Sequence, residues 1–420
     1  MKILIVGSGG REHALAWKCS LSPKVEKIYC APGNAGIAQL AELVPLKPDQ
    51  FDELADFAAS NEIDLTIIGM DDPLAGGIVD VFEARGLRVF GPRKRAAILE
   101  ASKAFSKDLM KKYGIPTASY ETFTKLEEAK EYLKKLGKFP VVLKASGLAL
   151  GKGVLICEDL ESALAGADAI MGEKKFGQAG DEMVVEEFLT GREVSVLTFV
   201  DGRHLKEMSS AQDYKRAGDG DTGPNTGGMG TVAPNPFYTD AVAAQCMETI
   251  FLPTIRAMKA EGREFRGCLY FGLMITKDGP KVIEYNCRFG DPETQVVLPL
   301  LESDLLTVMQ AVTAGKLAEC EVKFRDANAC CVVLASAGYP VSYGKGYEIT
   351  IPADVLPHVY VAGAAEKDGK LVTSGGRVLG VTAVAGTLQE ARDEAYAMAD
   401  RIEFENKYCR RDIAARALNA

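Results

Sequence analysis

Residues 139–157, FPVVLKASGLALGKGVLIC, hold two short apolar runs separated by a glycine-rich segment. Each run has the length and composition of a buried strand, so we predict a strand, a glycine loop and a second strand. The loop differs from a P-loop: three residues instead of four separate Gly147 from Gly151, and Gly153 stands where Ser or Thr would hold Mg²⁺. A glycine hairpin that places Lys152 over phosphates fits better, and a plain β-turn with an exposed lysine is the alternative.

Towards the N-terminus, strand-like and helix-like segments alternate. The expected strands are 2–6, 25–31, 65–69 and 88–91, and the expected helices are 11–20, 49–60 and 74–85. Strands that alternate with helices build a parallel sheet covered on both faces. We therefore predict an α/β first domain over residues 1–101, with a doubly wound parallel sheet.

The first glycine cluster, Gly7-Ser8-Gly9-Gly10-Arg11-Glu12, follows a strand and opens a helix. This is where backbone N–H groups can bind phosphate. It is not a dinucleotide fingerprint, because Glu12 occupies the position of the third glycine. A phosphate site and a tight structural turn both remain open.

The remaining chain divides into a central domain over residues 102–325 and a C-terminal α+β domain over 326–420. Within the central domain, about 120–190 should form a small lid subdomain. We expect the following elements: helix over 103–136 apart from a break at 114–116, paired strands over 192–210, strands at 267–276 and 280–286, helices at 239–260 and 302–314, and C-terminal strands at 329–335, 347–351, 359–362 and 377–384 before a helix at 388–401. Residues 217–236 are so rich in Gly and Pro that we expect no helix or strand there.

Polar side chains gather in Val282-Ile283-Glu284-Tyr285-Asn286-Cys287-Arg288-Phe289-Gly290-Asp291-Pro292-Glu293. On a strand, Glu284 and Asn286 project from the same face. Two oxygen donors there suit Mg²⁺, which takes hard ligands and keeps waters for substrate phosphates. A buried salt-bridge network is the alternative. The long irregular loop over 212–230 is the second candidate for a functional segment.

Composition narrows the class of protein. The formal net charge is −9 with Lys and Arg dispersed, which gives no electrostatic support for nucleic-acid binding. No apolar run approaches the ~18 residues that span a bilayer, and the N-terminal apolar stretch is too short for a secretory signal. The ten Cys form no C-x-x-C pair and the three His are scattered, so we expect reduced thiols and no His-based zinc site. A cytoplasmic protein without membrane or nucleic-acid partners is expected.

Together these motifs resemble the ATP-grasp superfamily and, within it, the phosphoribosylamine–glycine ligase family, also called glycinamide ribonucleotide synthetases. The segments that carry the resemblance are GSGGREHALAW (7–17), APGNAG (31–36), GLALGKGV (147–154), EEFLTGREVS (186–195), QDYKR (212–216), DTGPNTGGMG (221–230), EYNCRFGDPETQ (284–295), SGGRVL (374–379) and YCRRDIAARA (408–417). They extend from one end of the chain to the other.

The resemblance implies an ADP-forming carbon–nitrogen ligase of purine biosynthesis. Its substrates would be glycine, 5-phosphoribosylamine and ATP, with Mg²⁺ or Mn²⁺, and glycyl phosphate would be the intermediate. A monomer is expected, with a dimer as the alternative. An ATP-grasp enzyme with a formyl or carboxyl donor, a dehydrogenase and a non-catalytic nucleotide sensor are the competing hypotheses.

The resemblance also implies roles for individual residues. The catalytic set is Arg288, Lys152 and Asp213. The ATP set is Lys103, Lys144, Gly151, Gly153, Glu186, Glu187, Phe188, Leu189 and Glu193. The substrate set is Gly9, Gly10, Asn34, Asp71, Lys215, Gly228 and Asp291. The metal ligands would be Glu284 and Asn286.

Three positions depart from the family pattern. Asp71 stands where Glu is usual, Tyr214 where His is usual, and Leu150 where a small residue is common. The shorter Asp71 would need a water or a shifted backbone to reach the sugar.

Overall fold

The structure is a computed structural model that describes residues 1–149 and 152–420. Its first part is a five-stranded, all-parallel sheet of order β3-β2-β1-β4-β5. The strands are β1 (Lys2–Gly7), β2 (Lys27–Pro32), β3 (Glu42–Leu43), β4 (Leu65–Ile68) and β5 (Val89–Phe90). The helices are α1 (Gly10–Ser20), α2 (Phe51–Ser60), α3 (Asp71–Gly76), α4 (Ile78–Ala84) and α5 (Lys94–Ala101). The predicted parallel α/β sheet is confirmed.

One expected helix of this part is divided in two. The predicted helix 74–85 begins earlier, at Asp71, and breaks at Gly77, whose φ of +103° no helix can accommodate. The early start matters for the site, because it places Asp71 at the first residue of α3, just after the carboxyl end of β4. Ligands of open α/β sheets bind at the carboxyl ends of the strands, and both the glycine turn after β1 and Asp71 lie there.

The centre of the molecule is a four-stranded antiparallel sheet of order β11-β10-β16-β17. Its strands are β10 (Arg192–Asp201), β11 (Leu205–Glu207), β16 (Arg266–Thr276) and β17 (Gly279–Asn286). The helices of this region are α6 (Lys103–Tyr113), α9 (Asp240–Cys246), α10 (Leu252–Ala260), α11 (Thr294–Leu300) and α12 (Leu305–Thr313). Helix α11, which carries Pro299, was not predicted.

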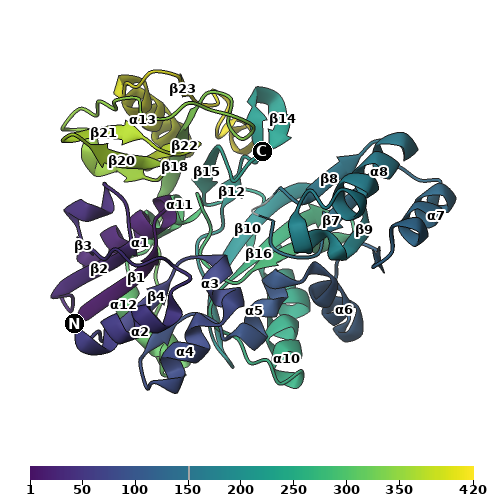
Figure 1. Cartoon of the computed structure of the whole chain (residues 1–420), viewed down its shortest axis with the longest axis horizontal. Helices are drawn as coiled ribbons and strands as arrows, with labels where there is room; N and C mark the ends of the chain where they lie inside the picture. The colour runs from purple at the N-terminus through teal and green to yellow at the C-terminus, as the bar shows by residue number, and fades with distance from the viewer. Residues whose placement is uncertain (150–151) are drawn as a thin grey trace.

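A second antiparallel sheet, of order β6-β9-β7-β8, extends away from the rest on the right of Figure 1. It contains β6 (Tyr120–Phe123), β7 (Val141–Ala145), β8 (Val154–Cys157) and β9 (Met183–Glu187), with helices α7 (Leu126–Leu136) and α8 (Leu160–Ala167). The strands on either side of the glycine loop pair as predicted. The expectation that only a break at 114–116 interrupts the helix over 103–136 is wrong, because β6 also lies between α6 and α7 and pairs with β9.

The third sheet has the order β12-β15-β18-β22-β19, with β23 also pairing with β18. Its strands are β12 (Gln212–Asp213), β15 (Gly230–Ala233), β18 (Asn328–Ser336), β19 (Val359–Val361), β22 (Arg377–Ala385) and β23 (Lys407–Tyr408), and helices α13 (Leu388–Arg401) and α14 (Ala415–Leu418) accompany them. Two hairpins, β13 (Arg216–Gly218) with β14 (Thr222–Asn225) and β20 (Ala364–Lys367) with β21 (Lys370–Thr373), complete the strands.

Two expectations about this region are wrong. Residues 217–236 do contain strands: β14 and β15 lie there, and β15 brings the central chain into the C-terminal sheet beside β18. Glycine permits this pairing, since a Cβ on Gly230 would stand 2.8 Å from the carbonyl oxygen of Cys331. The predicted strand 347–351 makes only isolated bridges, between Glu348 and Val372 and between Thr350 and Glu403.

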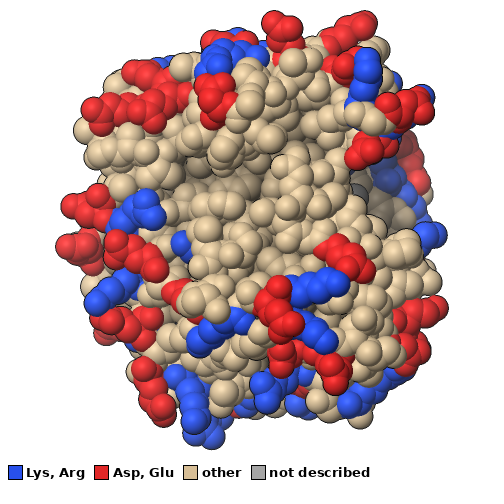
Figure 2. All heavy atoms as spheres, turned by 90° about the vertical axis from the view of Figure 1, so that its left-hand side faces the viewer, with Lys and Arg blue, Asp and Glu red and all other residues tan. Residues whose placement is uncertain are grey.

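Charged side chains of both signs alternate around the face shown in Figure 2, and the hollowed middle of that face is mostly uncharged. Neither sign gathers into a continuous patch on the part of this face that the structure describes. Within residues 1–149 and 152–420, no helix is both long and apolar enough to cross a membrane.

Candidate active site

A cavity of about 690 Å³ opens where the N-terminal, central and C-terminal parts of the chain meet. Its wall includes Asp71 after β4, Lys144 on β7, Glu284 on β17 and Arg377 on β22. Side chains that are far apart in the sequence therefore converge on one space. A smaller cavity of about 320 Å³ lies beside it and shares Arg416 with it.

The end of β9 forms one wall of the cavity. Glu186 is buried, and its carboxylate lies 3.1 Å from the ammonium nitrogen of Lys107 and 3.0 Å from that of Lys144. Burial lowers the pKa of Lys107 to about 8, although Glu186 opposes the shift. The Glu186 side chain is therefore engaged by two cations of the protein, whereas Phe188 and Leu189 supply apolar surface to the cavity.

Glu187, the next residue of this hinge, also borders the cavity. It accepts a hydrogen bond from the backbone N–H of Ser119 at 3.0 Å and lies 3.6 Å from Lys281. The hydrogen bond from Ser119 lowers its pKa. This arrangement ties the small sheet to the segment that precedes β6.

Two further lysines line the cavity near the glycine loop. Lys103, at the first residue of α6, donates to the carbonyl oxygen of Gly147 at 3.0 Å, and burial lowers its pKa. Lys152 is exposed and borders the cavity together with Gly153. The expected ATP-binding residue Gly151, like the family departure at Leu150, falls outside the described residues.

Four charged groups meet at the centre of the cavity. The ammonium nitrogen of Lys215 lies 3.4 Å from Glu284 and 3.9 Å from Glu193. Burial lowers the pKa of Lys215, but Asp213, Glu284 and Glu193 raise it well above its ordinary value. For Glu284, burial alone would raise the pKa. The positive charges of Lys215, Lys144 and Lys103 have the larger effect and lower the pKa to about 2. Glu284 is therefore an ionised carboxylate at any physiological pH.

Asp213 behaves differently from Glu284 although it lies in the same cavity. Burial raises its pKa to about 7, with Lys215 opposing the shift. One carboxyl of the cavity is thus held firmly ionised and another titrates near neutrality, a separation typical of acid–base pairs in active sites.

The end of β17 carries the second half of the predicted metal motif. The side-chain oxygen of Asn286 accepts a hydrogen bond from Arg288 at 3.1 Å. Arg288 also lies 3.4 Å from Glu100, while its Nε is buried without a hydrogen-bond partner among the described residues. A buried donor without a partner costs free energy unless a ligand accepts from it, so Arg288 is suited to an anionic ligand.

Asp291 connects the glycine turn after β1 to the C-terminal sheet. Its carboxylate lies 3.4 Å from Arg377 and accepts a hydrogen bond from Gln295 at 2.8 Å. Burial raises its pKa, but Arg377 and Arg11 hold it below its ordinary value. A Cβ on Gly9 would stand 3.3 Å from this carboxylate and one on Gly10 would stand 3.7 Å from it. The two glycines therefore lie against Asp291 without lining the cavity themselves.

Gly228 lies at the same junction. Its carbonyl oxygen accepts from Arg377 at 3.4 Å, beside stronger bonds from Arg377 to the carbonyl oxygens of Gly227 and Asp291, both at 2.8 Å. With φ of +119° and a virtual Cβ 2.5 Å from Pro292, this position has room only for glycine.

A side chain of α1, the helix that follows, fills the space inside the turn after β1. Glu12 is buried, accepts a hydrogen bond from the backbone N–H of Gly9 at 2.7 Å and pairs with Arg11 at 2.6 Å. A Cβ on Gly7 would stand 2.5 Å from the Glu12 side chain. The glycines here make room for Glu12, which supports the structural-turn alternative for Gly7 and Gly9.

Two residues singled out from the sequence face away from the cavity. Asn34 donates to the carbonyl oxygens of Ser8 and Val361, both at 2.8 Å, and accepts from the backbone of Gly36 and Ile37. All of its hydrogen-bonding capacity is used within the protein. Tyr214 is fully buried in the C-terminal core, so its departure from the family pattern does not alter the wall of the cavity directly.

Several further residues of the cavity wall were not predicted from the sequence. Glu100 and Lys107 lie on helices without any motif, and only a polar residue on an otherwise buried helix face would have marked them. Arg377 lies inside the segment SGGRVL, which the resemblance did include. All three act through contacts with residues remote in the sequence, which no local pattern reveals.

The arrangement can hold a polyanion next to a carboxylate-rich centre. Lys103, Lys144, Lys152 and Arg288 supply positive charge along one cavity, and Glu284 with Asn286 supplies hard oxygen donors. Among the described residues, no cluster of three or more His, Cys, Asp or Glu is arranged to hold a metal ion by itself. The pair would therefore share a cation with ligands from a phosphate chain and water.

Comparisons with known proteins agree along the whole chain. Residues 1–100, 101–294 and 329–416 match the N domain, the ATP-grasp (A) domain and the C domain of the phosphoribosylglycinamide synthetase family. The chain is 50% identical over 416 residues to a phosphoribosylamine–glycine ligase of Caldanaerobacter subterraneus subsp. tengcongensis, covering 99% of this chain and 100% of the relative. It is 48% identical to the one from Clostridium acetobutylicum, with 98% and 99% covered.

Solved structures give the same result. The phosphoribosylamine–glycine ligase of Thermotoga maritima is 39% identical, with a TM-score of 0.87 and coverage of 99% of this chain and 100% of that chain. A biotin carboxylase complex from Campylobacter jejuni matches with a TM-score of 0.74 over 97% of this chain and 92% of that chain. It is only 17% identical, so it bears on the fold alone.

Proposed function

The chain belongs to the phosphoribosylglycinamide synthetase family, the ATP-dependent ligases that join glycine to 5-phosphoribosylamine in purine biosynthesis, and we propose how its cavity carries out this ligation. The observation that carries the proposal is the convergence of Lys103, Lys144, Lys215 and Arg288 on the ionised carboxylate of Glu284. Several cations around one carboxylate suit a site that must neutralise a phosphate chain and retain a metal donor.

ATP is proposed to lie along the small sheet. Phe188 and Leu189 would pack against the adenine, and the hinge from Glu186 to Leu189 would take its polar edge. Glu193 would accept the ribose hydroxyls, while Lys103, Lys144, Gly153 and Lys152 would approach the phosphates. The support is that every one of these residues borders the same cavity. Glu186 contributes by orienting Lys144 rather than by its own carboxylate.

A divalent cation, Mg²⁺ or Mn²⁺, fits the donor set of Glu284 and Asn286. Their oxygens now accept from Lys215 and Arg288, so each is already oriented towards positive charge. When bound there, the cation would supply positive charge that neutralises the transferred phosphoryl group. The two protein cations would then be free to contact anionic substrates.

The reaction is proposed to run through glycyl phosphate. A carboxylate oxygen of glycine attacks the γ-phosphorus of ATP, the bond to the bridging oxygen breaks, and ADP leaves. The nitrogen of 5-phosphoribosylamine then attacks the glycyl carbon, and phosphate leaves with the former glycine oxygen. Arg288 is the candidate to hold the attacking carboxylate, because a guanidinium can donate to two oxygens at once.

Asp213 is the proposed acceptor for the proton that the amine loses. Its buried carboxyl borders the cavity and titrates near neutrality, as a general base at physiological pH requires. Asp71 and Asp291, at the carboxyl ends of the N-terminal strands and beside the glycine turn, are proposed to bind the sugar and amine end. Gly9 and Gly10, which lie against Asp291, and Gly228, which lies against Pro292, would shape the backbone around that substrate, and Asn34 would hold the turn after β1.

We also propose the domain division 1–101, 102–325 and 326–420, with a lid at about 120–190. A monomer is the proposed active unit.

The test of this function is an ADP-release assay with phosphoribosylamine generated in the reaction. ADP should form at a sustained rate only when glycine, phosphoribosylamine, ATP and a divalent cation are all present. Replacing glycine by alanine or serine should abolish the rate. Sustained ADP formation with formate or bicarbonate in place of glycine would contradict the proposal.

A further inference from the structure

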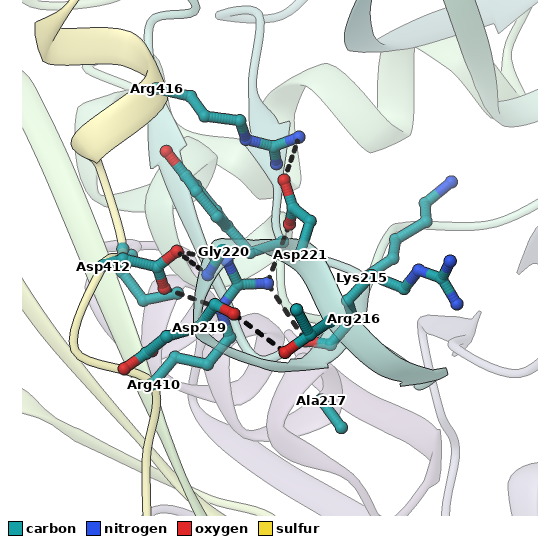
Figure 3. Close-up of polar contacts among 12 residues, drawn as sticks. Lys215, Arg216, Ala217, Asp219, Gly220, Asp221, Arg410, Asp412 and Arg416 are labelled. Carbon is teal, nitrogen blue, oxygen red and sulfur yellow. Dashed lines mark hydrogen bonds and ion pairs between the residues drawn. The ribbon is translucent and has the colours of Figure 1, made fainter.

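We propose that Arg416, supported by Arg410, is a positioning residue: the C-terminal segment 408–416 holds in place the segment 213–221, which carries Asp213 and Lys215. The inference rests on the proposed function only in giving those two residues a part in the reaction. The contacts are drawn in Figure 3.

Tyr214, between β12 and β13, fixes the start of this segment. It is fully buried in the C-terminal core, whereas its two neighbours, Asp213 and Lys215, border the active-site cavity. Successive side chains of an extended segment point to opposite sides, so fixing Tyr214 on one side fixes its neighbours on the other. Two guanidinium groups lie over its ring. The central carbon of the Arg416 guanidinium is 4.4 Å from the ring centroid, and that of Arg410 is 5.2 Å from it. Such cation–π contacts are stronger when desolvated.

Arg416 joins both ends of the segment 213–221. Its guanidinium donates to the carbonyl oxygen of Asp213 at 2.9 Å and lies 3.2 Å from the carboxylate of Asp221. The planar fork of arginine can make both contacts together with the stacking contact, which lysine cannot. Figure 3 shows Arg416 reaching from the C-terminal helix across to Asp221.

Arg410 contacts the same segment, 213–221, through its own set of hydrogen bonds. Its side chain is completely buried, and it donates to the carbonyl oxygen of Arg216 and to Asp221, both at 3.0 Å. Asp412 pairs with Arg410 at 2.7 Å and accepts from the backbone N–H of Gly220 at 2.9 Å.

Backbone and hydroxyl contacts complete the attachment. Tyr408 donates to the carbonyl oxygen of Ala217 at 2.7 Å, and the backbone N–H of Arg411 donates to Asp219 at 2.8 Å. These contacts link positions that are 191 and 192 residues apart in the sequence. The segment 213–221 is therefore fixed by the last residues of the chain.

The proposed reaction requires that Lys215 be placed accurately. Its ammonium group lies between Glu284 at 3.4 Å and Glu193 at 3.9 Å, the proposed metal and ribose residues. A misplacement of about 1 Å in an active site can reduce turnover by about 100-fold. Loosening the segment 213–221 should therefore affect turnover more than substrate affinity.

The experiment compares Arg416→Ala with Arg411→Ala in the full-length chain. Arg411 lies in the same segment, but its exposed side chain pairs with Asp400 at 2.6 Å and only its backbone contacts the segment 213–221. The readouts are kcat and KM for ATP and for glycine, the thermal midpoint, and hydrogen–deuterium exchange of peptides covering 212–221.

For Arg416→Ala we expect faster exchange over 212–221, a fall in kcat of about 10- to 100-fold and KM values within about threefold of wild type. Arg411→Ala should match the wild type in every readout. Unchanged exchange and kcat in Arg416→Ala would overturn the proposal. So would a rise in KM for ATP alone with unchanged exchange, since Arg416 would then contact the nucleotide directly.

A double-mutant cycle with Asp221→Ala guards against a general loss of folding. If Arg416 and Asp221 act through one contact, the kcat of the double variant should be well above the product of the two single effects. Multiplicative losses would overturn the proposal. Hydrogen exchange needs no turnover, so a failure of the wild type to form ADP would count against the proposed function and leave this inference separately tested.

Discussion

The carboxylate of Glu100, at the end of helix α5, accepts a hydrogen bond from the backbone N–H of Cys287 at 2.6 Å, just past the end of strand β17. The same carboxylate lies 3.4 Å from Arg288. One buried side chain of the N-terminal part thereby fixes the strand end that carries the proposed metal ligands and the proposed carboxylate-binding arginine.

Glu100 should make stability depend on pH. Burial raises its pKa from 4.5 to about 7, although Arg288 opposes the shift. Between these values the folded chain retains a proton that the unfolded chain releases, so the contribution of Glu100 to stability falls as pH rises through this window and is constant above it. Glu100→Gln keeps the acceptor for Cys287 and removes the titration.

We expect the free energy of unfolding of the wild type, relative to Glu100→Gln, to decline between about pH 5 and pH 7 and then level off. Chemical denaturation at a series of pH values measures this difference. Glu248→Gln, at an exposed position, serves as the carboxylate control. A difference that stays constant across the range would show that Glu100 does not titrate there.

Glu284→Gln should abolish most of the metal-dependent turnover while the fold is retained. The change removes the carboxylate charge and leaves the size of the side chain, and the charge stabilisation lost at such a site is typically several kcal/mol. We expect kcat to fall by at least about 100-fold at saturating ATP. The exposed Asp278, in the turn between β16 and β17, gives the matched control Asp278→Asn. Wild-type turnover of Glu284→Gln in Mg²⁺ would refute its role as a ligand.

Asp71→Ala should raise the KM for phosphoribosylamine and leave the KM for ATP unchanged. Asp71 borders the cavity at the start of α3, and the loss of a hydrogen bond to a charged group costs roughly 1.5–3 kcal/mol, or about 10- to 100-fold in KM. Its exposed neighbour provides the control Asp72→Ala, which should alter neither constant. Equal effects of Asp71→Ala on both substrates would indicate a general structural defect.

The elements that were predicted correctly are those whose type follows from the residue pattern within a single segment. The alternation of strands and helices gave the parallel sheet, and the apolar runs around the glycine loop gave β7 and β8. Glu284 and Asn286 could be identified because a strand places every second side chain on one face.

The misses have a common physical cause, which is pairing with partners remote in the sequence. Gly230 to Ala233 forms a strand between β12 and β18, and its longer pairing is with β18, nearly a hundred residues further along the chain, at Val332 to Ala329. Glu100 and Cys287 are 187 residues apart, and Arg377 and Gly227 are 150 residues apart. The glycines of this loop allow two backbones to approach closely. A glycine-rich sequence is equally compatible with irregular structure, so the pattern alone does not predict the strand.

The most direct test of the central claim is the fate of oxygen in glycine. If glycine is activated as an acyl phosphate, one carboxylate oxygen must leave with the phosphate when the amide forms. Turnover of glycine labelled with ¹⁸O in both carboxylate oxygens should therefore place one labelled oxygen in each inorganic phosphate, with ADP as the nucleotide product. Release of AMP and pyrophosphate with the label in AMP, or formation of unlabelled phosphate, would contradict the account.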